Sequence, residues 1–274
     1  MLEENSDAQA EAVEAEFMYQ YESMASASTK ARLGISTARI GGGVVLSMRH
    51  DVTGYWSKAL GFGFTEPVTS SLIDEVVSFY RAADSAGAVI QIAPTALPAD
   101  WNEISLRHNI SPESSWIKLG GRPDALRRGQ DTALRVGPVG PKQVEEWATV
   151  TLNGFGMPLE GLVEMMAASA ANPDFRPYAA WDGDEIVATA NLFIRNGVAS
   201  LNSAATLPTY RNRGAQSALI DARAKEAAHA GCRWAVAECG KTGDAAANPS
   251  LNNLLRAGMR PLYTRQNWIW RPLD

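Results

Sequence analysis

The residues best suited to chemistry form one polar segment, Ala205–Ser217, which reads ATLPTYRNRGAQS. A strand pattern precedes it and a helical pattern follows it, so the segment is expected to turn between a strand and a helix. In such a turn, successive backbone N–H groups and the helix N-terminus point at one spot and can bind phosphate. Arg211 and Arg213 add charge suited to a pyrophosphate, and Gly214 would let a ligand approach the backbone. Taken alone, this pattern is more typical of an ordinary loop with a Gly hinge and solvated arginines.

The elements that must position this segment are clearest in the second half of the chain. The sequence there predicts, in order, a strand over 133–139, helices beginning at Pro141 and Pro158, strands over 176–181, 185–195 and 198–206, a helix over 214–230, a strand over 234–239, a helix from Asn248-Pro249 to Gly258, and closing strands over 261–271. Asn196-Gly197 is the type I′ hairpin dipeptide, because both central residues of that turn need positive φ. The three central strands are therefore expected to be antiparallel.

The first half repeats this order more weakly. Its predicted elements are a strand over 41–48, a helix over 71–86, a strand over 88–93, a helix over 101–108 and a strand over 115–119. Leu72-Ile73-Asp74 before its helix-ending glycine parallels Leu219-Ile220-Asp221 before its own. The spacings do not match strictly, so a duplicated fold and a chance similarity both stay open. The turn-prone stretch 120–129 is the expected junction.

Composition narrows the class of protein. The chain has 274 residues, 46% hydrophobic and 20% charged, with a net charge of −5, which excludes a disordered, collagen-like or coiled-coil chain. No apolar run is long enough to span a membrane, and neither half is basic enough for a nucleic-acid surface. The three histidines match no metal-ligand spacing. We therefore expect no metal, nucleic-acid partner or membrane partner.

The first 25 residues and the two cysteines indicate where in the cell the protein is expected. Seven carboxylates and no Lys or Arg lie in residues 1–25, which is unlike a secretory signal. This segment is expected to be a solvated helix or a frayed end, with a partner-binding role as the less favoured alternative. Cys232 and Cys239 cannot build a disulfide framework, so a cytoplasmic location is expected.

From about residue 130 onward, the order of elements resembles the GNAT family of acyl-CoA-dependent N-acetyltransferases. The phosphate motif of that family reads Arg/Gln-x-x-Gly-x-Gly/Ala after a strand end that contains proline, and Pro208, Arg211 and Gly214 stand at these positions. A second family element is a helix that begins with Asn and ends with Gly and a large apolar residue. Here this element runs from Asn248 to Gly258-Met259.

The resemblance implies an α/β (α+β) fold of tandem GNAT-like domains, each a mixed, mostly antiparallel sheet flanked by helices. The expected parts are an acidic N-terminal tail or helix over 1–25, a degenerate GNAT-like domain over 26–125 and a complete acetyltransferase domain over 126–274. The first-half helix at Ser71 has no Arg-x-x-Gly before it, so the phosphate site is expected in the C-terminal domain alone.

The resemblance also implies how acetyl-CoA would bind. Backbone amides of 213–217 would hold the pyrophosphate, and the strand end 205–207 would pair with the pantetheine arm as an added strand. The Leu207 amide would polarise the thioester carbonyl, and Asn248 would lie near the thiol end. The cofactor-binding residues expected in full are Ala205, Thr206, Leu207, Arg211, Asn212, Arg213, Gly214, Ala215, Gln216, Ser217 and Asn248.

Two positions depart from the family pattern. Gln216 occupies the last Gly/Ala position, where a side chain that points away would still permit binding. Leu254 stands where many members place a tyrosine that protonates the leaving thiolate. Tyr263, on the following strand, is the replacement acid, with simple packing on the sheet as the favoured alternative. A CoA thiol has a pKa near that of cysteine, about 8.5, so the thiolate can also leave without an acid.

The remaining candidates concern the amine acceptor. Glu238 is the expected base, with pairing to an arginine or a loop amide as the alternative. Asn202 and Ser203 would hold a water relay, although cross-strand hydrogen bonding is the favoured interpretation. In the family, the region of Phe155 and Met157 shapes the acceptor pocket.

The function implied is transfer of an acetyl group to a primary amine by direct attack, without an acyl-enzyme. The acceptor is expected to be a small molecule or a peptide, and the protein a monomer, with a homodimer as the alternative. A non-catalytic CoA-binding or GNAT-like scaffold protein remains the competing hypothesis.

Overall fold

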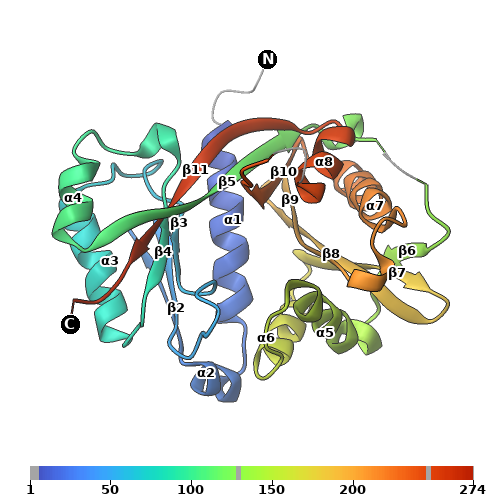
Figure 1. Cartoon of the computed structure of the whole chain (residues 1–274), viewed down its shortest axis with the longest axis horizontal. Coiled ribbons are helices and arrows are strands. Elements are labelled where there is room, and N and C mark those ends of the chain that lie inside the picture. Colours follow the sequence, from blue (N-terminus) through green and yellow to red (C-terminus); the bar gives the residue numbers. More distant parts are fainter. Residues whose placement is uncertain (1–5, 128–130, 245–247, 274) are drawn as a thin grey trace. The chain divides into compact units, whose positions relative to one another are not determined.

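The computed structural model of the chain describes residues 6–127, 131–244 and 248–273. The chain divides into two compact units (Figure 1). Unit 1 comprises Met1–Ile117 with Tyr263–Asp274, and unit 2 comprises Lys118–Leu262. This division differs from the expected boundaries at residues 25 and 125, because the N-terminal helix and most of the last strand belong to unit 1.

Unit 1 contains a mixed sheet flanked by helices. Its elements are α1 (Ser6–Ser23), α2 (Ala27–Leu33), β1 (Ile35–Ile40), β2 (Gly43–Met48), β3 (Lys58–Leu60), α3 (Ser70–Ala82), β4 (Ala88–Gln91), η1 (Pro94–Ala96), α4 (Trp101–Arg107), the first part of β5 (Ile110–Gly121) and most of β11 (Arg260–Trp270). The strand order is β1-β2-β3-β4-β11-β5. Strands β3 and β4 are parallel and α3 connects them, whereas β1–β2, β2–β3 and β4–β11 are antiparallel.

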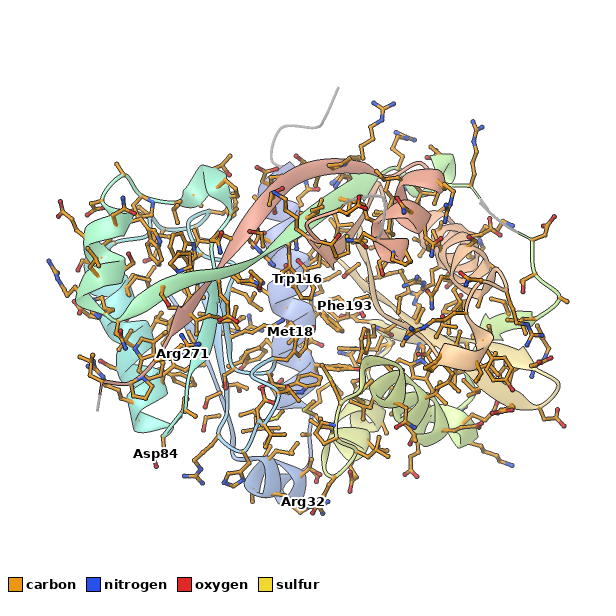
Figure 2. All side chains as sticks on the ribbon, viewed as in Figure 1. Met18, Arg32, Asp84, Trp116, Phe193 and Arg271 are labelled. Atoms are coloured by element: carbon orange, nitrogen blue, oxygen red, sulfur yellow. The ribbon has the colours of Figure 1, made fainter. Side chains whose placement is uncertain are left out.

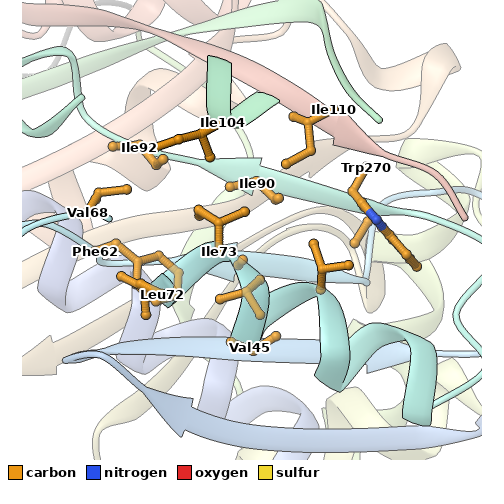
Figure 3. Close-up of a cluster of buried hydrophobic side chains, with 14 of the residues drawn as sticks. Val45, Phe62, Val68, Leu72, Ile73, Ile90, Ile92, Ile104, Ile110 and Trp270 are labelled. Atoms are coloured by element: carbon orange, nitrogen blue, oxygen red, sulfur yellow. The ribbon is translucent and has the colours of Figure 1, made fainter. Parts of the chain in front are cut away.

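The core of unit 1 is built around α3 (Figure 3). This helix begins at Thr69, whose side chain accepts a hydrogen bond from the Leu72 amide at 3.2 Å. Ile73, Val76 and Tyr80 then recur at helical spacing and are at most 1% exposed. The buried stripe packs with side chains of β2 and β4, as expected for an amphipathic helix on a sheet.

Helix α1 is an integral part of unit 1, which corrects the expectation of a solvated or frayed segment. Val13, Phe17 and Met18 are at most 6% exposed, and α1 packs on β2. Met18 lies among neighbouring side chains in Figure 2, whereas Asp84 lies at the surface. Composition misled here because three of the acids of α1 are themselves buried.

Glu22 is the most isolated of these buried acids, and it makes stability depend on pH. Its side chain is 0% exposed, and neither carboxyl oxygen has a hydrogen-bond partner among the described residues. Burial raises the pKa of Glu22 well above its ordinary value of 4.5, against the opposing effect of Lys58. A carboxyl group whose pKa is raised by folding stabilises the protein below its unfolded pKa, and this stability is lost as pH rises toward the folded pKa.

We therefore expect the free energy of unfolding of the full chain to fall above about pH 4.5, by up to about 1.4 kcal/mol per pH unit. Glu22→Gln should flatten this dependence. Urea unfolding from about pH 5 to about pH 9 measures it, with the exposed Glu75→Gln as the control. An unchanged pH dependence in Glu22→Gln would show that Glu22 is not the group responsible.

Unit 2 contains the remaining strands and the helices that flank them. Its elements are the last residues of β5, η2 (Pro123–Ala125), β6 (Arg135–Pro138), η3 (Pro141–Gln143), α5 (Val144–Phe155), α6 (Leu162–Ser169), β7 (Phe175–Asp182), β8 (Glu185–Arg195), β9 (Val198–Thr206), η4 (Pro208–Tyr210), α7 (Ala215–His229), β10 (Trp234–Gly240), α8 (Pro249–Arg256) and the start of β11. The strand order is β5-β10-β9-β8-β7-β6. Strands β6 to β9 are antiparallel, and β9 is parallel to β10 with α7 as the crossover. The predicted bounds of β8 and β9 are confirmed.

The two units share a topology, so the tandem fold predicted from the sequence is confirmed. In each unit, antiparallel strands lead into a parallel pair joined by one helix: β3-α3-β4 in unit 1 and β9-α7-β10 in unit 2. The sequence did not predict α2, β1 or β3, which are short. No helix in the described part of the chain has the length and hydrophobicity needed to cross a membrane.

Strands β5 and β11 each contribute residues to both units. The end of β5, from Lys118, belongs to unit 2, where β5 neighbours β10. Conversely, β11 belongs to unit 1 from Tyr263 onward, and its residues 267–270 pair with β4. This exchange is the physical reason why a single cut near residue 125 does not describe the domains.

Candidate active site

Strands β9 and β10 of unit 2 separate part-way along their length. Their parallel pairing ends at Val236↔Ser200, although β9 continues to Thr206 and β10 to Gly240. Beyond Ser200, the edge of β9 that faces β10 therefore has no strand partner among the described residues. An unpaired strand edge is a template for an extended chain that adds to the sheet.

Strand β9 also carries a bulge just beyond the point where β9 and β10 separate, which is called the fork below. Asn202 faces Asn191 of β8 and Ala205 faces Thr189, so β9 contains one extra residue between the two pairs. Ser203, inside the bulge, has a φ of 49°, which non-glycine residues adopt only rarely. Bulges redirect a strand and are frequent next to active sites.

The loop after β9 leads into an uncapped helix N-terminus. Gly214 is the N-cap of α7, and no side chain makes a capping hydrogen bond there. The first amides of α7, from Ala215 to Ser217, precede the point where intrahelical bonding begins, since the Gly214 carbonyl accepts from Ala218 at 3.1 Å. Unbonded N–H groups of this kind, together with the helix dipole, favour the binding of an anion. The phosphate site predicted from the sequence stays a prediction.

Gly214 is required by the fold as well as by a ligand. Its φ is +78°, and a Cβ added there would lie 2.3 Å from the carbonyl oxygen of Asp131. From the sequence, Gly214 was expected only to let a ligand approach the backbone. The structure adds that no other residue type fits without moving the chain.

The two arginines of the loop differ in their surroundings. Arg213 donates to Asp182 at 2.8 Å and lies over the ring of Tyr210 at 5.3 Å, and the Tyr210 hydroxyl donates to Glu185 at 3.1 Å. These contacts fasten the loop to the β7–β8 turn, although an exposed ion pair is worth only about 0–1 kcal/mol. Arg211 is exposed and has no hydrogen bond or ion pair from its side chain within the described ranges.

The hydrogen bonds of Gln216 and Leu207 determine which polar groups at the end of β9 remain available to a ligand. The Gln216 side-chain amide donates to the Ala205 carbonyl at 2.8 Å and to the Thr206 hydroxyl at 3.0 Å, so this side chain turns toward the strand. The Leu207 amide donates to the Val187 carbonyl at 3.1 Å. Its expected role as a donor to the thioester is therefore corrected, because the β8–β9 hydrogen bonding extends through Leu207.

Asn248 holds the opposite side of the fork. Its side-chain oxygen accepts from the Leu251 amide at 3.0 Å, and its side-chain amide donates to the Gly240 carbonyl at 2.7 Å. Asn248 therefore caps α8 and fixes that helix to the end of β10. Its predicted place near the thiol end of the cofactor stays a prediction.

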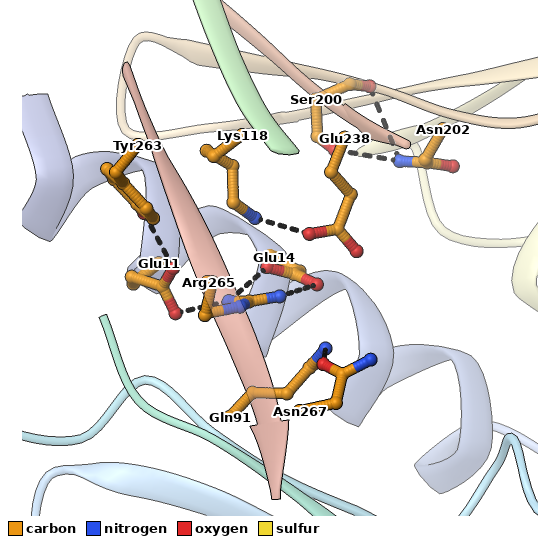
Figure 4. A network of polar contacts seen from close by, with 10 residues as sticks. All are labelled: Glu11, Glu14, Gln91, Lys118, Ser200, Asn202, Glu238, Tyr263, Arg265 and Asn267. Carbon is orange, nitrogen blue, oxygen red and sulfur yellow. Dashed lines mark hydrogen bonds and ion pairs between the residues drawn. The ribbon is translucent and has the colours of Figure 1, made fainter. Parts of the chain in front are cut away.

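Glu238 is paired with a buried lysine (Figure 4). Lys118 of β5 donates to Glu238 of β10 at 2.9 Å, and their side chains are 2% and 16% exposed. An arginine or a loop amide was the partner expected from the sequence, and Lys118 was not predicted. The missed signal was a lysine between Ile117 and Leu119 in an apolar strand, since a buried lysine needs a partner.

Tyr263 lies on the part of β11 that belongs to unit 1. Its hydroxyl donates to Glu11 at 2.6 Å (Figure 4). Burial, followed by the charge of Glu11, raises the pKa of Tyr263 above its ordinary value. The hydroxyl is thus neutral and its proton is engaged with Glu11; its role as the acid stays a prediction.

The residues expected to contact the amine acceptor lie at two places in unit 2. Asn202 accepts from the Asn191 side chain at 2.9 Å, which confirms the favoured cross-strand interpretation. Phe155, at the end of α5, is 52% exposed, and Met157 follows it half-buried. A Cβ on Gly154 would lie 2.7 Å from the Cβ of Ala205, so the end of α5 packs directly on the end of β9.

The Lys118–Glu238 pair leads to a prediction on stability. Lys118→Met leaves a largely buried carboxylate without this lysine, so the free energy of unfolding should fall by about 3 kcal/mol or more. Lys118→Met with Glu238→Gln should recover part of the loss. Urea unfolding of the full chain in a double-mutant cycle measures the coupling, with the exposed Lys225→Met as the control. Strictly additive losses would contradict the pairing.

No group of three or more potential metal ligands occurs in residues 6–127, 131–244 and 248–273. A cavity of about 700 Å³ in unit 2 is lined by residues that include Phe175, Arg176, Tyr178 and Glu226. These residues lie at the start of β7 and near the end of α7, and not on the loop of Gly214.

Comparison with known proteins is consistent with this architecture. A GCN5-related N-acetyltransferase from Kribbella flavida aligns with 97% of this chain and 96% of its own, with a TM-score of 0.62 and 18% identity. One from Sphaerobacter thermophilus aligns over 84% and 81%, with a TM-score of 0.56 and 14% identity. A tandem GNAT protein from the clavulanic acid biosynthesis pathway aligns over 98% and 97%, with a TM-score of 0.58 and 13% identity. No curated protein matches the sequence.

These likenesses place the chain in the class of tandem GNAT-fold proteins. Residues 143–249 in turn match the acetyltransferase (GNAT) family model. This segment, which holds the fork of β9 and β10, the Gly214 loop and α7, therefore resembles a GNAT acetyltransferase domain in sequence as well as in fold. The family and the fold point to acyl transfer.

Proposed function

We propose that unit 2 binds acetyl-CoA and transfers its acetyl group to a primary amine of a small molecule or peptide. One observation carries the proposal: the unpaired edge of β9 runs into the loop that ends at the uncapped N-terminus of α7. An extended arm and a pyrophosphate at its end would need this arrangement in this order.

Different residues of unit 2 would bind the phosphates, the pantetheine arm and the acceptor. The amides from Ala215 to Ser217 and the guanidinium of Arg211 would hold the phosphates. The pantetheine arm would lie along the edge of β9 between Ser200 and Thr206. Phe155 and Met157 would contact the acceptor, since the end of α5 packs on the end of β9.

The reaction would form one bond and break one. Acetyl-CoA supplies an activated acyl group: the amine nitrogen bonds to the carbonyl carbon, the carbon–sulfur bond breaks, and the thiolate leaves with the electron pair. Glu238 would accept the proton that the amine loses, directly or through water.

Calorimetric titration of acetyl-CoA into the full chain tests the proposal. We expect a dissociation constant in the micromolar range, about 10 μM or tighter, and no heat from S-acetyl-N-acetylcysteamine, which has the thioester but no phosphate. Arg211→Glu should weaken binding at least about tenfold, because it reverses one charge at the phosphates. Absence of acetyl-CoA binding by the unaltered protein would refute the proposal.

A CoA-binding protein without turnover is the second candidate. It is favoured by three observations: Leu254 replaces the family tyrosine, the Tyr263 hydroxyl is engaged with Glu11, and Glu238 is paired with Lys118. Thiol release from acetyl-CoA with a panel of lysine peptides, amino acids, polyamines and aminoglycosides separates the two. Binding without release on any amine would support the second candidate.

A further inference from the structure

Arg223 of α7 is a buried cation that the proposed function has not used. It is 1% exposed, and no carboxylate lies within ion-pair distance of it among the described residues. Burial lowers the pKa of Arg223 to about 9, so the guanidinium keeps its proton at neutral pH. A buried charge without a counter-ion carries a large desolvation cost.

Among the described residues, this guanidinium donates its hydrogen bonds to backbone carbonyls. Nε donates to the Leu219 carbonyl of its own helix at 3.1 Å. Nη1 donates to the carbonyls of Asn191 at 2.9 Å and Asn202 at 3.3 Å. Asn191 and Asn202 face each other across β8 and β9 at the edge of the bulge. Arg223 therefore joins the two strands where their regular pairing is interrupted.

The same helix holds β9 at a second point. Gln216, in the first turn of α7, donates to Ala205 and Thr206 at the end of β9. Arg223 follows seven residues later, about 10 Å along the helix. The N-terminus of α7 is the proposed phosphate site, so one rigid helix sets the spacing between the phosphates and the bulged strand.

We propose that Arg223 is a positioning residue for acyl transfer: it holds the bulge of β9 so that the strand edge presents the thioester carbonyl in its reactive orientation. The proposal rests on the proposed function. Arg223 acts through the backbone and does not touch the acyl-CoA. Without it, the phosphates would still bind to the α7 N-terminus, but the strand edge next to the thioester would relax.

The experiment compares Arg223→Lys and Arg223→Met with Lys225→Met, which changes an exposed residue of the same helix. The probe is acetyl-CoA labelled with ¹³C at the thioester carbonyl. We expect the unaltered protein and Lys225→Met to move the carbonyl NMR signal downfield, because a polarised carbonyl carbon is deshielded. Both Arg223 variants should bind the probe within about threefold of the same affinity but lose most of this shift.

Turnover supplies a second readout once an amine acceptor has been found. In Arg223→Lys, kcat should fall at least about tenfold while KM for acetyl-CoA changes less than about threefold, since the loss concerns orientation and not phosphate binding. Arg223→Lys should retain more activity than Arg223→Met, because it can still reach one carbonyl.

Three results would overturn the proposal. A full carbonyl shift in both Arg223 variants would show that the bulge does not depend on Arg223. Loss of folding in both variants, seen by circular dichroism, would assign Arg223 a purely structural role. Failure of the unaltered protein and of Lys225→Met to bind the probe would instead refute the proposed function on which the proposal rests.

Discussion

Gly214→Ala is expected to weaken acetyl-CoA binding at least about tenfold, which corresponds to about 1.4 kcal/mol or more. The substitution places a Cβ where the Asp131 carbonyl oxygen lies, at 2.3 Å, and forces alanine into a left-handed conformation that costs about 1–2 kcal/mol. Either Asp131 or the first turn of α7 must move. The amides that would hold the pyrophosphate belong to that turn, so the loss should appear in binding as well as in stability.

Gly231→Ala is the matched control, because Gly231 follows the same helix at its other end. Its φ is +74°, and a Cβ added there meets nothing within 4 Å. It should therefore lower the free energy of unfolding by about 1 kcal/mol through backbone strain alone and leave the affinity for acetyl-CoA unchanged. Calorimetric titration and thermal unfolding of both variants measure this difference. Equal affinity losses in the two variants, or none in Gly214→Ala, would contradict the role assigned to Gly214.

Unit 1 provides a comparison for the uncapped N-terminus of α7. Helix α3 occupies the same topological place between parallel strands, yet the Thr69 side chain caps its N-terminus through the Leu72 amide. That donor is satisfied within the protein and is less available to an anion. The segment before α3 also lacks the Arg-x-x-Gly sequence. These features support a single phosphate site, in unit 2.

Local sequence signals were sufficient to predict most of the helices and strands of unit 2. The Asn196-Gly197 turn fixed the register of β8 and β9, because a two-residue hairpin leaves little freedom in pairing. Gly231 and Gly258 correctly marked the ends of α7 and α8. The loop of Gly214 could be located because its glycine and arginines follow a strong strand pattern.

Long-range pairing was what the sequence could not supply. Nothing local to β5 and β11 shows that they complete sheets in different units, because strand order depends on contacts between distant segments. Lys118 and Arg223 were missed for a related reason. Each is a charged residue at an interior position of an apolar pattern, and each bonds to groups on strands that are distant in sequence. The buried face of α1 was hidden because its acids pair with β11, more than two hundred residues away.

Arg265→Met is expected to be the most destabilising substitution in unit 1. The Arg265 side chain is 0% exposed and contacts Glu11 at 2.5 Å and Glu14 at 2.9 Å, whose side chains are 1% and 10% exposed (Figure 4). Removing the guanidinium leaves two buried carboxylates without their main cation. The expected loss is about 3–5 kcal/mol or more, a large share of the 5–15 kcal/mol typical of a whole protein.

Two further variants decide whether this loss comes from charge and not from packing. Glu11→Gln with Glu14→Gln in the Arg265→Met background should recover much of the stability, since a buried ion cluster without charges is often close to neutral in free energy. Arg39→Met, on β1, is the control, because Arg39 pairs with Glu16 of α1 but is 53% exposed. It should cost less than about 1 kcal/mol. Urea unfolding of the full chain measures all of these. If the triple variant were as unstable as Arg265→Met alone, the effect would come from lost packing of the long arginine side chain, and α1 would be held to β11 by shape and not by charge.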